Sequence, residues 1–237
     1  MTEETGAVGA IIVAAGRGHR MGFGYNKVLA PICGRPVIEW TLRSLIDSAL
    51  ADKLILVVNP DDRDDMDRIC RPYVNKMDIS LVLGGPDRQD SVYNGLRALP
   101  EGVGLVLIHD GARPFADRGI FLRGIQNARK YGAACAGVPV KDTIKRVDEG
   151  KNIISTPPRK FLWSAQTPQV FKTEIIVKAY DHAFEKGIRS TDDAGLAEAA
   201  GFEVKMFLGG YKNIKLTSPE DILLAEQFMK TEAGKVE

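Results

Sequence analysis

The stretch AIIVAAGRGHRMG, residues 10–22, turns from an apolar run into a loop that holds two closely spaced glycines and several basic side chains. The apolar part is short and is closed by turn residues, which predicts a buried β-strand. Glycine has no Cβ, so the N–H groups around Gly16 and Gly18 can approach a phosphate closely. Arg20 and Lys27 follow in the sequence and can add charge-assisted hydrogen bonds to the same anion. The stretch therefore predicts a strand followed by a phosphate-binding loop.

The spacing of these glycines argues against two common nucleotide-binding motifs. After Gly16 and Gly18 the dinucleotide fingerprint expects a third glycine three residues on, but it comes one position late, at Gly22. The P-loop motif also fails, because no Gly-Lys-Ser/Thr follows. An ordinary glycine turn between a strand and a helix stays open as the alternative when the loop is taken alone.

Similar apolar runs recur along the chain and alternate with segments of helical spacing. Each run is short, nearly continuous and followed by turn residues, which is typical of strands buried on both faces of a sheet. Strands that alternate with helices predict right-handed crossovers and one doubly wound, mostly parallel sheet of the α/β class. Ligands of such sheets lie beyond the carboxyl ends of the strands, where the glycine-rich and charged segments of this chain fall. Beyond the first run, the predicted strands are residues 53–58, 79–83, 104–109 and 204–208, and the predicted helices are 37–50, 92–99, 174–186, 192–200 and one that starts after Ser218.

The segment 140–165 departs from this alternation. It combines short β-branched stretches with an Asp-Glu-Gly turn and a Pro-Pro pair, which predicts a hairpin or arm instead of another strand-helix-strand unit. We therefore predict a single domain over residues 1–237 with a projecting β-arm at 140–165.

Composition restricts the classes of function. The 32 basic and 31 acidic residues give a net charge of +1, which argues against a basic surface for nucleic acid, so no nucleic-acid partner is expected. The three cysteines lack the spacings of a zinc site and favour a reducing, cytoplasmic compartment. The short acidic N-terminal stretch does not resemble a signal peptide, and no apolar run approaches the roughly 18 residues of a membrane span. No membrane partner is expected.

Seven stretches of the chain resemble one protein family, and they occur in the family's order along nearly the whole sequence. The family is that of the cytidylyltransferases of 2-C-methyl-D-erythritol 4-phosphate, which act in the non-mevalonate isoprenoid pathway and have a fold of nucleotidyltransferase type. The glycine loop with a distant lysine is shared by many nucleotidyltransferases, whereas HDGARP, RQDSVYNGL, KDTIK and NIKLT are more specific. The stretches are AAGRGHRMG with Lys27, GGPDRQDSVYNGL from Gly84, HDGARPF from His109, VPVKDTIKR from Val138, TPQVF from Thr167, TDDAG from Thr191 and NIKLTSPEDI from Asn213.

The resemblance implies a reaction between CTP and a sugar-alcohol phosphate. The substrate phosphate attacks the α-phosphorus of CTP in line, which gives 4-diphosphocytidyl-2-C-methyl-D-erythritol and releases pyrophosphate. Such a reaction needs no nucleophile from the protein, so catalysis depends on positioning and on cations that meet the developing negative charge. The resemblance assigns this catalytic role to Arg20, Lys27 and Lys215.

The resemblance also implies which residues bind the nucleotide and its metal. Asp110 follows an apolar run and would coordinate the Mg²⁺ that accompanies CTP; a turn in which Asp110 caps the following segment is the alternative. His109 is expected to be structural, because the attacking phosphate is already anionic. One departure is Pro86, which stands where some members carry an acidic residue after the second glycine. The expected nucleotide contacts come from Ala14, Ala15, Gly16, Gly18, Gly85, Ser91 and Thr167.

The sugar-alcohol phosphate would be bound by residues of both the body and the arm. In the family the arm crosses to a second subunit, so the resemblance implies a homodimer with arm exchange, in which Thr143 and Arg159 complete the partner's site. A hairpin that packs its apolar residues on its own domain is the alternative. The expected substrate contacts are Asp110, Gly111, Arg113, Thr143, Arg159, Thr191 and Lys215.

Three other functions are consistent with parts of the sequence. A close relative would transfer CMP to ribitol 5-phosphate and differ mainly in the alcohol pocket. A non-catalytic nucleotide-binding protein could share the fold, but the presence of Arg20, Lys27, Asp110 and Lys215 argues against it. An NAD-dependent oxidoreductase would fit the alternation of strands and helices but not the late third glycine.

Overall fold

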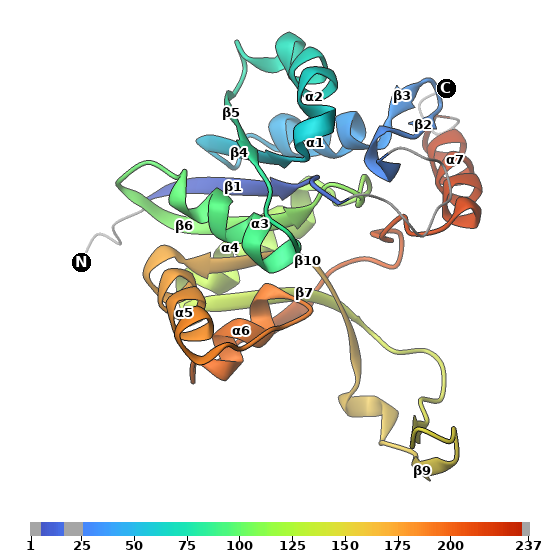
Figure 1. The fold of residues 1–237 in the computed structure, drawn as a ribbon. Helices are drawn as coiled ribbons and strands as arrows, with labels where there is room; N and C mark the ends of the chain where they lie inside the picture. Colours follow the sequence, from blue (N-terminus) through green and yellow to red (C-terminus); the bar gives the residue numbers. More distant parts are fainter. Residues whose placement is uncertain (1–5, 17–25, 234–237) are drawn as a thin grey trace.

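The computed structural model describes residues 6–16 and 26–233, and the predictions made for Gly18 and Arg20 lie outside these residues. Its central sheet consists of β1 (Ala7–Val13), β4 (Lys53–Val58), β5 (Asp78–Leu83), β6 (Val103–Asp110), β7 (Ala133–Pro139), β10 (Trp163–Lys172) and β11 (Lys205–Leu208). The spatial order is β11-β7-β10-β6-β1-β4-β5 (Figure 1). Within this sheet β10 runs antiparallel to both of its neighbours, and the other pairs are parallel. The structure confirms the predicted α/β fold with a doubly wound, mostly parallel sheet.

Helices cover both faces of the sheet. Successive side chains of β1 point to opposite faces, so Ile12 packs in one hydrophobic core and Ile11 in the other. Both isoleucines are fully buried, as expected of a strand between two helical layers. The core around Ile12 includes side chains of α1 (Val37–Ser48), α2 (Arg63–Cys70) and α4 (Arg118–Tyr131), and the core around Ile11 includes side chains of α3 (Arg88–Arg97), α5 (Thr173–Lys186) and α6 (Asp193–Ala199).

The predicted strands and the observed strands differ in informative places. The four runs predicted after the first strand correspond to β4, β5, β6 and β11. The prediction that 79–83 is buried on both faces is wrong, because β5 lies at the edge of the sheet and its residues are only partly buried or exposed. Neither β7 nor β10 has a counterpart among the predicted strands. Small residues make up most of β7, and Gln166, Thr167 and Gln169 interrupt the apolar pattern of β10.

The segment between β7 and β10 projects from the body as an arm (Figure 1). It contains β8 (Arg146–Val147) paired with β9 (Ile153–Ser155), and then a short 3-10 helix, Arg159–Phe161. The predicted boundary at residue 165 lies inside β10, because residues 163–165 pair with β7. The arm therefore spans residues 140–162, and the sheet extends further toward it than predicted.

The C-terminal helix α7 (Pro219–Ala233) packs on the small hairpin of β2 (Pro31–Ile32) and β3 (Arg35–Pro36). Ile32 and Leu216 are fully buried in the hydrophobic cluster at this contact. The cluster joins the segment that precedes α7 to the hairpin that follows β1. Within the described residues, no helix combines the length and the apolar character needed to cross a membrane.

Candidate active site

A cavity of about 1250 Å³ opens at the carboxyl edge of the parallel strands. Ala14 follows β1, Asn59 follows β4 and Gly84 follows β5, and all three line the cavity. Asp110, the last residue of β6, lines it as well. Parallel α/β sheets bind ligands at this edge because the loops after the strands converge there. The cavity is therefore the candidate active site.

The cavity brings together most of the predicted site residues that the structure describes. Gly111, Arg113 and Thr167 are buried close to Asp110 in the fold but are not among the residues that line the cavity. Thr143 and Arg159 lie on the arm and are exposed. The predicted residues that line the cavity are Ala14, Ala15, Gly16, Lys27, Gly85, Ser91, Asp110, Thr191 and Lys215.

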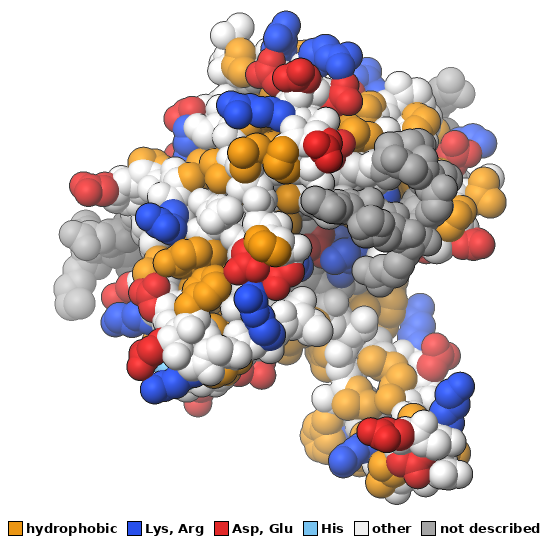
Figure 2. Space-filling model, viewed as in Figure 1, with side chains coloured by type: hydrophobic (Ala, Val, Ile, Leu, Met, Phe, Trp, Pro, Cys, Tyr) orange, Lys and Arg blue, Asp and Glu red, His pale blue; other side chains and the backbone are white. Residues whose placement is uncertain are grey.

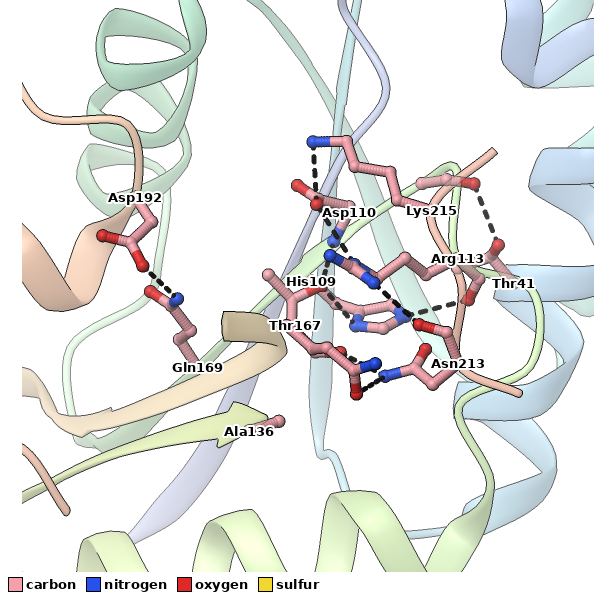
Figure 3. A network of polar contacts seen from close by, with 12 residues as sticks. Thr41, His109, Asp110, Arg113, Ala136, Thr167, Gln169, Asp192, Asn213 and Lys215 are labelled. Atoms are coloured by element: carbon pink, nitrogen blue, oxygen red, sulfur yellow. Dashed lines mark hydrogen bonds and ion pairs between the residues drawn. The ribbon is translucent and has the colours of Figure 1, made fainter. Parts of the chain in front are cut away.

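Asp110 lies at the centre of a charged cluster on the cavity wall (Figure 3). Its Oδ2 is 3.0 Å from Nζ of Lys215 and 3.4 Å from Nε of Arg113, and its Oδ1 is 3.3 Å from Nε of Arg88. Burial disfavours the charged carboxylate, but the three cations outweigh burial and hold the pKa of Asp110 well below its usual range. The side chain of Lys215 is 35% exposed and lines the cavity, so a cation held against Asp110 also faces the ligand space.

A chain of hydrogen bonds holds the backbone of Asp110 from behind. Nε2 of His109 is 3.1 Å from the carbonyl of Arg113, which can only accept, so this nitrogen carries the proton. Nδ1 of His109 then accepts from the Thr167 hydroxyl at 3.0 Å, and the Thr167 oxygen accepts from the Asp110 backbone N–H at 2.9 Å. His109 is fully buried, and burial lowers its pKa to about 4. The neutral ring thus positions Asp110 through Thr167, which supports the prediction that His109 is structural.

The segment that carries Lys215 is held by hydrogen bonds on both sides of the lysine. Nη1 of Arg113 donates to the carbonyl of Asn213 at 2.7 Å, and Nδ2 of Asn213 donates to the carbonyl of Thr167 at 2.8 Å (Figure 3). On the other side, the N–H of Leu216 donates to a carbonyl of the loop after β6 at 2.9 Å. Asn213 is fully buried, so these contacts lie within the protein interior. They fix the backbone from which Lys215 reaches into the cavity.

The loop after β5 approaches the end of β1 so closely that only glycine fits. A Cβ on Gly84 would lie 2.3 Å from the Cβ of Ala15. Next to it, the Ser91 hydroxyl accepts from the N–H of Gly85 at 3.1 Å and donates to the carbonyl of Asp87 at 2.7 Å. The hydroxyl proton of Ser91 is therefore engaged within the protein, and the side chain shapes the loop that forms this wall.

Lys27 lines the cavity from a short 3-10 helix, Lys27–Leu29, whose position is set by Asn26. Nδ2 of this buried asparagine donates to the carbonyl of Ala14 at 2.7 Å and to the carboxylate of Asp62 at 2.8 Å. Its oxygen caps the 3-10 helix by accepting a backbone N–H. Because Ala14 directly follows β1, Asn26 ties the lysine segment to the end of the central strand.

Three polar residues of the site were not predicted from the sequence. Asn26 and Asn213 hold the two lysine segments, and Arg88 lies between Asp110 and Asp193. Asparagine in a loop and arginine at the start of a helix are usual on protein surfaces, so no local pattern marks them. The stretches GGPDRQDSVYNGL and NIKLTSPEDI include Arg88 and Asn213, and the family resemblance was the available signal for both.

Backbone-lined loops and lysines at the carboxyl edge of a doubly wound sheet are features of α/β proteins that bind phosphorylated ligands, and the chain falls in this class. The model of the IspD family, 2-C-methyl-D-erythritol 4-phosphate cytidylyltransferase, matches residues 8–231. The chain therefore belongs to the 2-C-methyl-D-erythritol 4-phosphate cytidylyltransferase family. A protein of that name from Caldanaerobacter subterraneus subsp. tengcongensis is 43% identical over 224 residues, which cover 94% of this chain and 99% of the relative. Another, from Bacillus velezensis, is 43% identical over 225 residues, which cover 94% and 96%.

Solved structures agree with this assignment. The 4-diphosphocytidyl-2C-methyl-D-erythritol synthase of Anaerococcus prevotii superposes with a TM-score of 0.86 at 36% identity, over 95% of this chain and 96% of the other. The 2-C-methyl-D-erythritol 4-phosphate cytidylyltransferase of Thermus thermophilus gives 0.78 at 32% identity, over 94% and 99%. The comparisons confirm the resemblance drawn from the sequence motifs, and as a member of this family the chain is a nucleotidyltransferase.

Proposed function

We propose that the chain joins CTP and 2-C-methyl-D-erythritol 4-phosphate to give 4-diphosphocytidyl-2-C-methyl-D-erythritol and pyrophosphate. The observation that carries this proposal is the cavity that gathers Lys27, Asp110, Thr191 and Lys215 from four separate segments of the chain. The relatives described above are named for this activity. They do not favour the ribitol 5-phosphate alternative.

The proposed chemistry is a displacement at the α-phosphorus of CTP. A phosphate oxygen of the sugar-alcohol phosphate bonds to this phosphorus, the bond from the α-phosphorus to the bridging oxygen breaks, and pyrophosphate leaves with that oxygen. Lys27 and Lys215 line the cavity and would meet the negative charge that grows on the α-phosphate and the leaving group. The resemblance assigns Arg20, which lies outside the described residues, to the same task. Because Asn26 and Asn213 fix the two lysine segments, the backbone positions of Lys27 and Lys215 are set before the substrates bind.

Selection of the cytosine base would depend on the backbone. Ala14, Ala15 and Gly85 line the cavity where two loops approach each other, which leaves less room for a purine. Ser91 keeps the shape of this wall. Asp87 caps α3, so any base contact from an acidic residue after the second glycine is not carried over to this chain.

Within one chain, some residues would contact the sugar-alcohol phosphate directly, and another would act indirectly by holding a segment of the site. Thr191 and Lys215 line the cavity and are placed for direct contact. Arg113 is engaged with Asp110 and with the carbonyl of Asn213, so its contribution would be to hold the segment that carries Lys215. Thr167 would act on the nucleotide side in a similar indirect way, through the backbone of Asp110.

Mg²⁺ is the divalent cation that we propose for this reaction. Among the described residues, no three or more His, Cys, Asp and Glu side chains gather into a possible metal cluster. Asp110, the single predicted metal ligand, offers a carboxylate at the cavity wall, and it is already surrounded by three cations. A single carboxylate suits Mg²⁺, which keeps several waters and takes its other ligands from phosphate oxygens. When bound on the triphosphate, the metal would neutralise part of its charge.

We further propose a homodimer in which the arm reaches the cavity of its partner. Figure 2 shows hydrophobic side chains gathered on the projecting arm. Ile153, Ile154 and Phe161 are 62%, 55% and 73% exposed in the single chain, and exposed apolar groups of this kind mark interaction surfaces. Covering them against a second copy would bring Thr143 and Arg159 to that copy's site. A twofold arrangement would give two identical sites per dimer.

We place the reaction in the cytoplasm. Cys33, Cys70 and Cys135 are unpaired, which is typical of proteins in a reducing compartment. Burial raises the pKa of Cys70 and Cys135 to about 12, so these two thiols stay protonated and unreactive. The net charge of +1 likewise supports a function that involves no nucleic acid.

The experiment that tests this function is release of pyrophosphate from CTP and Mg²⁺, with 2-C-methyl-D-erythritol 4-phosphate and ribitol 5-phosphate in parallel and with ATP, GTP and UTP as nucleotide controls. We expect release with CTP and the methylerythritol phosphate. Preference for ribitol phosphate would keep the mechanism and change the substrate. No release with either alcohol would overturn the proposal.

A further inference from the structure

Arg88 connects three parts of the cavity wall that the proposed function uses. It is the first residue of α3, and its side chain reaches both the end of β6 and the start of α6. Its Nε is 3.3 Å from Oδ1 of Asp110, while Nη1 and Nη2 are 3.1 and 2.8 Å from the two carboxylate oxygens of Asp193. One planar guanidinium therefore binds two carboxylates that come from different elements.

Asp193 is anchored firmly enough to define the position of Arg88. This aspartate is fully buried, and its Oδ1 also accepts from the Tyr180 hydroxyl at 2.6 Å. Its backbone N–H donates to Oε1 of Gln169 at 3.0 Å. Tyr180, on α5, is itself fully buried in the hydrophobic core around Ile11. A carboxylate that is held through both its backbone and its side chain fixes the guanidinium with which it pairs.

Arg88 also sets the direction in which the Asp110 carboxylate turns. Oδ1 of Asp110 pairs with Arg88, whereas Oδ2 is shared by Lys215 and Arg113. The last torsion of an aspartate side chain is broad, so the group is oriented only when partners hold it. With Oδ1 held by Arg88, Oδ2 stays directed at Lys215, and this contact places the ammonium group that faces the cavity.

The same guanidinium fixes the segment before α6. Thr191 lines the cavity two residues before Asp193, which is the first residue of α6. Arg88 ties this segment to α3, and α3 also contains Ser91, which shapes the loop on the nucleotide side. The two sides of the cavity are thus joined through one side chain.

We propose that Arg88 is a positioning residue that aligns the nucleotide side and the sugar-phosphate side of the cavity by holding Asp110 and Asp193 at once. This role rests on the proposed function and deepens it. Arg88 acts on the chemical step through Asp110 and Lys215, whereas its contact with Asp193 holds the segment of Thr191, which we propose contacts the sugar-alcohol phosphate. Lysine cannot replace it, because a single ammonium group lacks the planar fork that binds both carboxylates together.

The test compares Arg88→Lys with Arg97→Lys, a matched control at the exposed end of the same helix. Pyrophosphate release is measured with CTP and 2-C-methyl-D-erythritol 4-phosphate varied separately, and thermal unfolding is followed for each variant. We expect Arg88→Lys to lower kcat by about 10- to 100-fold, as for a reacting group misplaced by about 1 Å, with the KM for CTP changed by less than about threefold. Arg97→Lys should match the wild type. Equal kinetics of the two variants would overturn the proposal.

A second measurement separates positioning through Lys215 from general structural damage. In a Lys215→Ala background, Arg88→Lys should lower kcat by less than about threefold, because the group that Arg88 orients is absent. Single-turnover assays give these low rates. A loss as large as that in the wild-type background would show that Arg88 acts independently of Lys215, and the proposal would fall.

A third variant covers the case in which Arg88→Lys does not fold because Asp193 is left buried without its full partner. Tyr180→Phe removes one anchor of Asp193 and keeps both ion pairs of Arg88, and we expect about a three- to tenfold loss of kcat at unchanged KM for CTP. No loss would overturn the proposal. The wild-type assay distinguishes failure of the proposed function from failure of the positioning role. An inactive wild type refutes the proposed function. An active wild type whose Arg88→Lys or Tyr180→Phe variant has an unchanged kcat refutes only the positioning role.

Discussion

Asp110 is 6% exposed and its carboxylate contacts three cations of its own chain, whereas Ile153 on the arm is 62% exposed and faces solvent in the single chain. The aspartate is held by contacts from β10, α3 and the loop before α7. The hairpin that carries Ile153 pairs with itself, through β8 and β9. The part of the proposed site around Asp110 is therefore complete within one chain. The arm, in contrast, has an apolar surface that nothing covers in the single chain.

This contrast predicts different consequences of substitution in the two regions. Changes beside Asp110 should act on the rate of the chemical step, because they alter charge at positions that are already fixed. Changes on the arm should act on assembly and on the binding of one substrate.

Lys215→Ala should have the largest effect. We expect kcat to fall by about 10³-fold, since the variant removes a cation that faces the cavity from a site where charge develops. The fold should persist, because Arg88 and Arg113 still pair with Asp110. Pyrophosphate release and circular dichroism measure the two properties, and Lys205→Ala on the exposed part of β11 is the control. Turnover near the wild-type rate would show that the lysine only balances the charge of the buried aspartate.

Ile153→Glu should separate the subunits of the proposed dimer. A charge at a buried apolar contact is expected to raise the dissociation constant by about 100-fold or more. Sedimentation velocity over a range of concentrations measures this change. Leu223→Glu is the matched control, because Leu223 on α7 is 66% exposed and lies outside the arm. A variant that stays dimeric, or a wild type that is monomeric, would favour a hairpin that works within its own chain.

Arg159→Ala should weaken the binding of the sugar-alcohol phosphate more than the binding of CTP. Loss of a charge-assisted contact to a phosphate is expected to raise the KM for this substrate by about 30-fold. Arg146→Ala, on the exposed strand β8 of the same arm, is the control.

Mixing Arg159→Ala with Lys27→Ala tests whether the arm crosses. If sites are shared between subunits, each mixed dimer has one site with both defects and one with neither. At a sugar-alcohol phosphate concentration below the wild-type KM, where both parent variants are nearly inactive, random exchange should therefore restore about one quarter of the wild-type activity. Failure to recover activity after verified subunit exchange would place Arg159 in the site of its own chain.

The sequence predicted the strands that are runs of large apolar side chains, and it failed at β7, where the side chains are small, and at β10, where polar side chains find distant partners. β1, β4 and β6 are nearly continuous apolar runs. In β10, Gln166 and Gln169 are buried, and their amides donate to the carbonyl of Gly210 at 2.9 Å and to the carboxylate of Asp192 at 2.8 Å. These partners come from other segments, so the local pattern could not show that the glutamines belong to a strand.

The same limit explains which site residues were found. Lys27, Asp110 and Lys215 stand in stretches that resemble the family, and the structure places all three on one cavity. The local pattern gave no sign of Arg88, because its partners Asp110 and Asp193 lie 22 and 105 residues away in the sequence. A charge at the start of a helix is usually solvated, and only the assembled sheet shows that this one joins two carboxylates.

The smallest expected effect is a pH dependence of the free energy of unfolding, which comes from the buried His109. Burial holds the pKa of His109 at about 4 in the folded chain, whereas histidine in an unfolded chain titrates near 6.5. Between these values the unfolded state binds more protons, so the contribution of His109 to stability is complete above pH 6.5 and is lost as the pH falls toward 4. From pH 7 to pH 5.5 the free energy of unfolding, measured with urea, should fall by about 1 kcal/mol.

Two variants test whether this change of the free energy of unfolding with pH, the slope, comes from His109. His109→Gln should flatten it, and only slopes are compared, because glutamine also alters the hydrogen bonds to Thr167 and Arg113. A variant slope equal to that of the wild type would assign the effect to other groups. Ile153→Glu should keep the full slope, because the arm makes no contribution to the burial of His109 in the single chain. Loss of the slope in that variant would mean that the arm and the buried residues around Asp110 are not independent. Dimer assembly would then affect the protonation of His109.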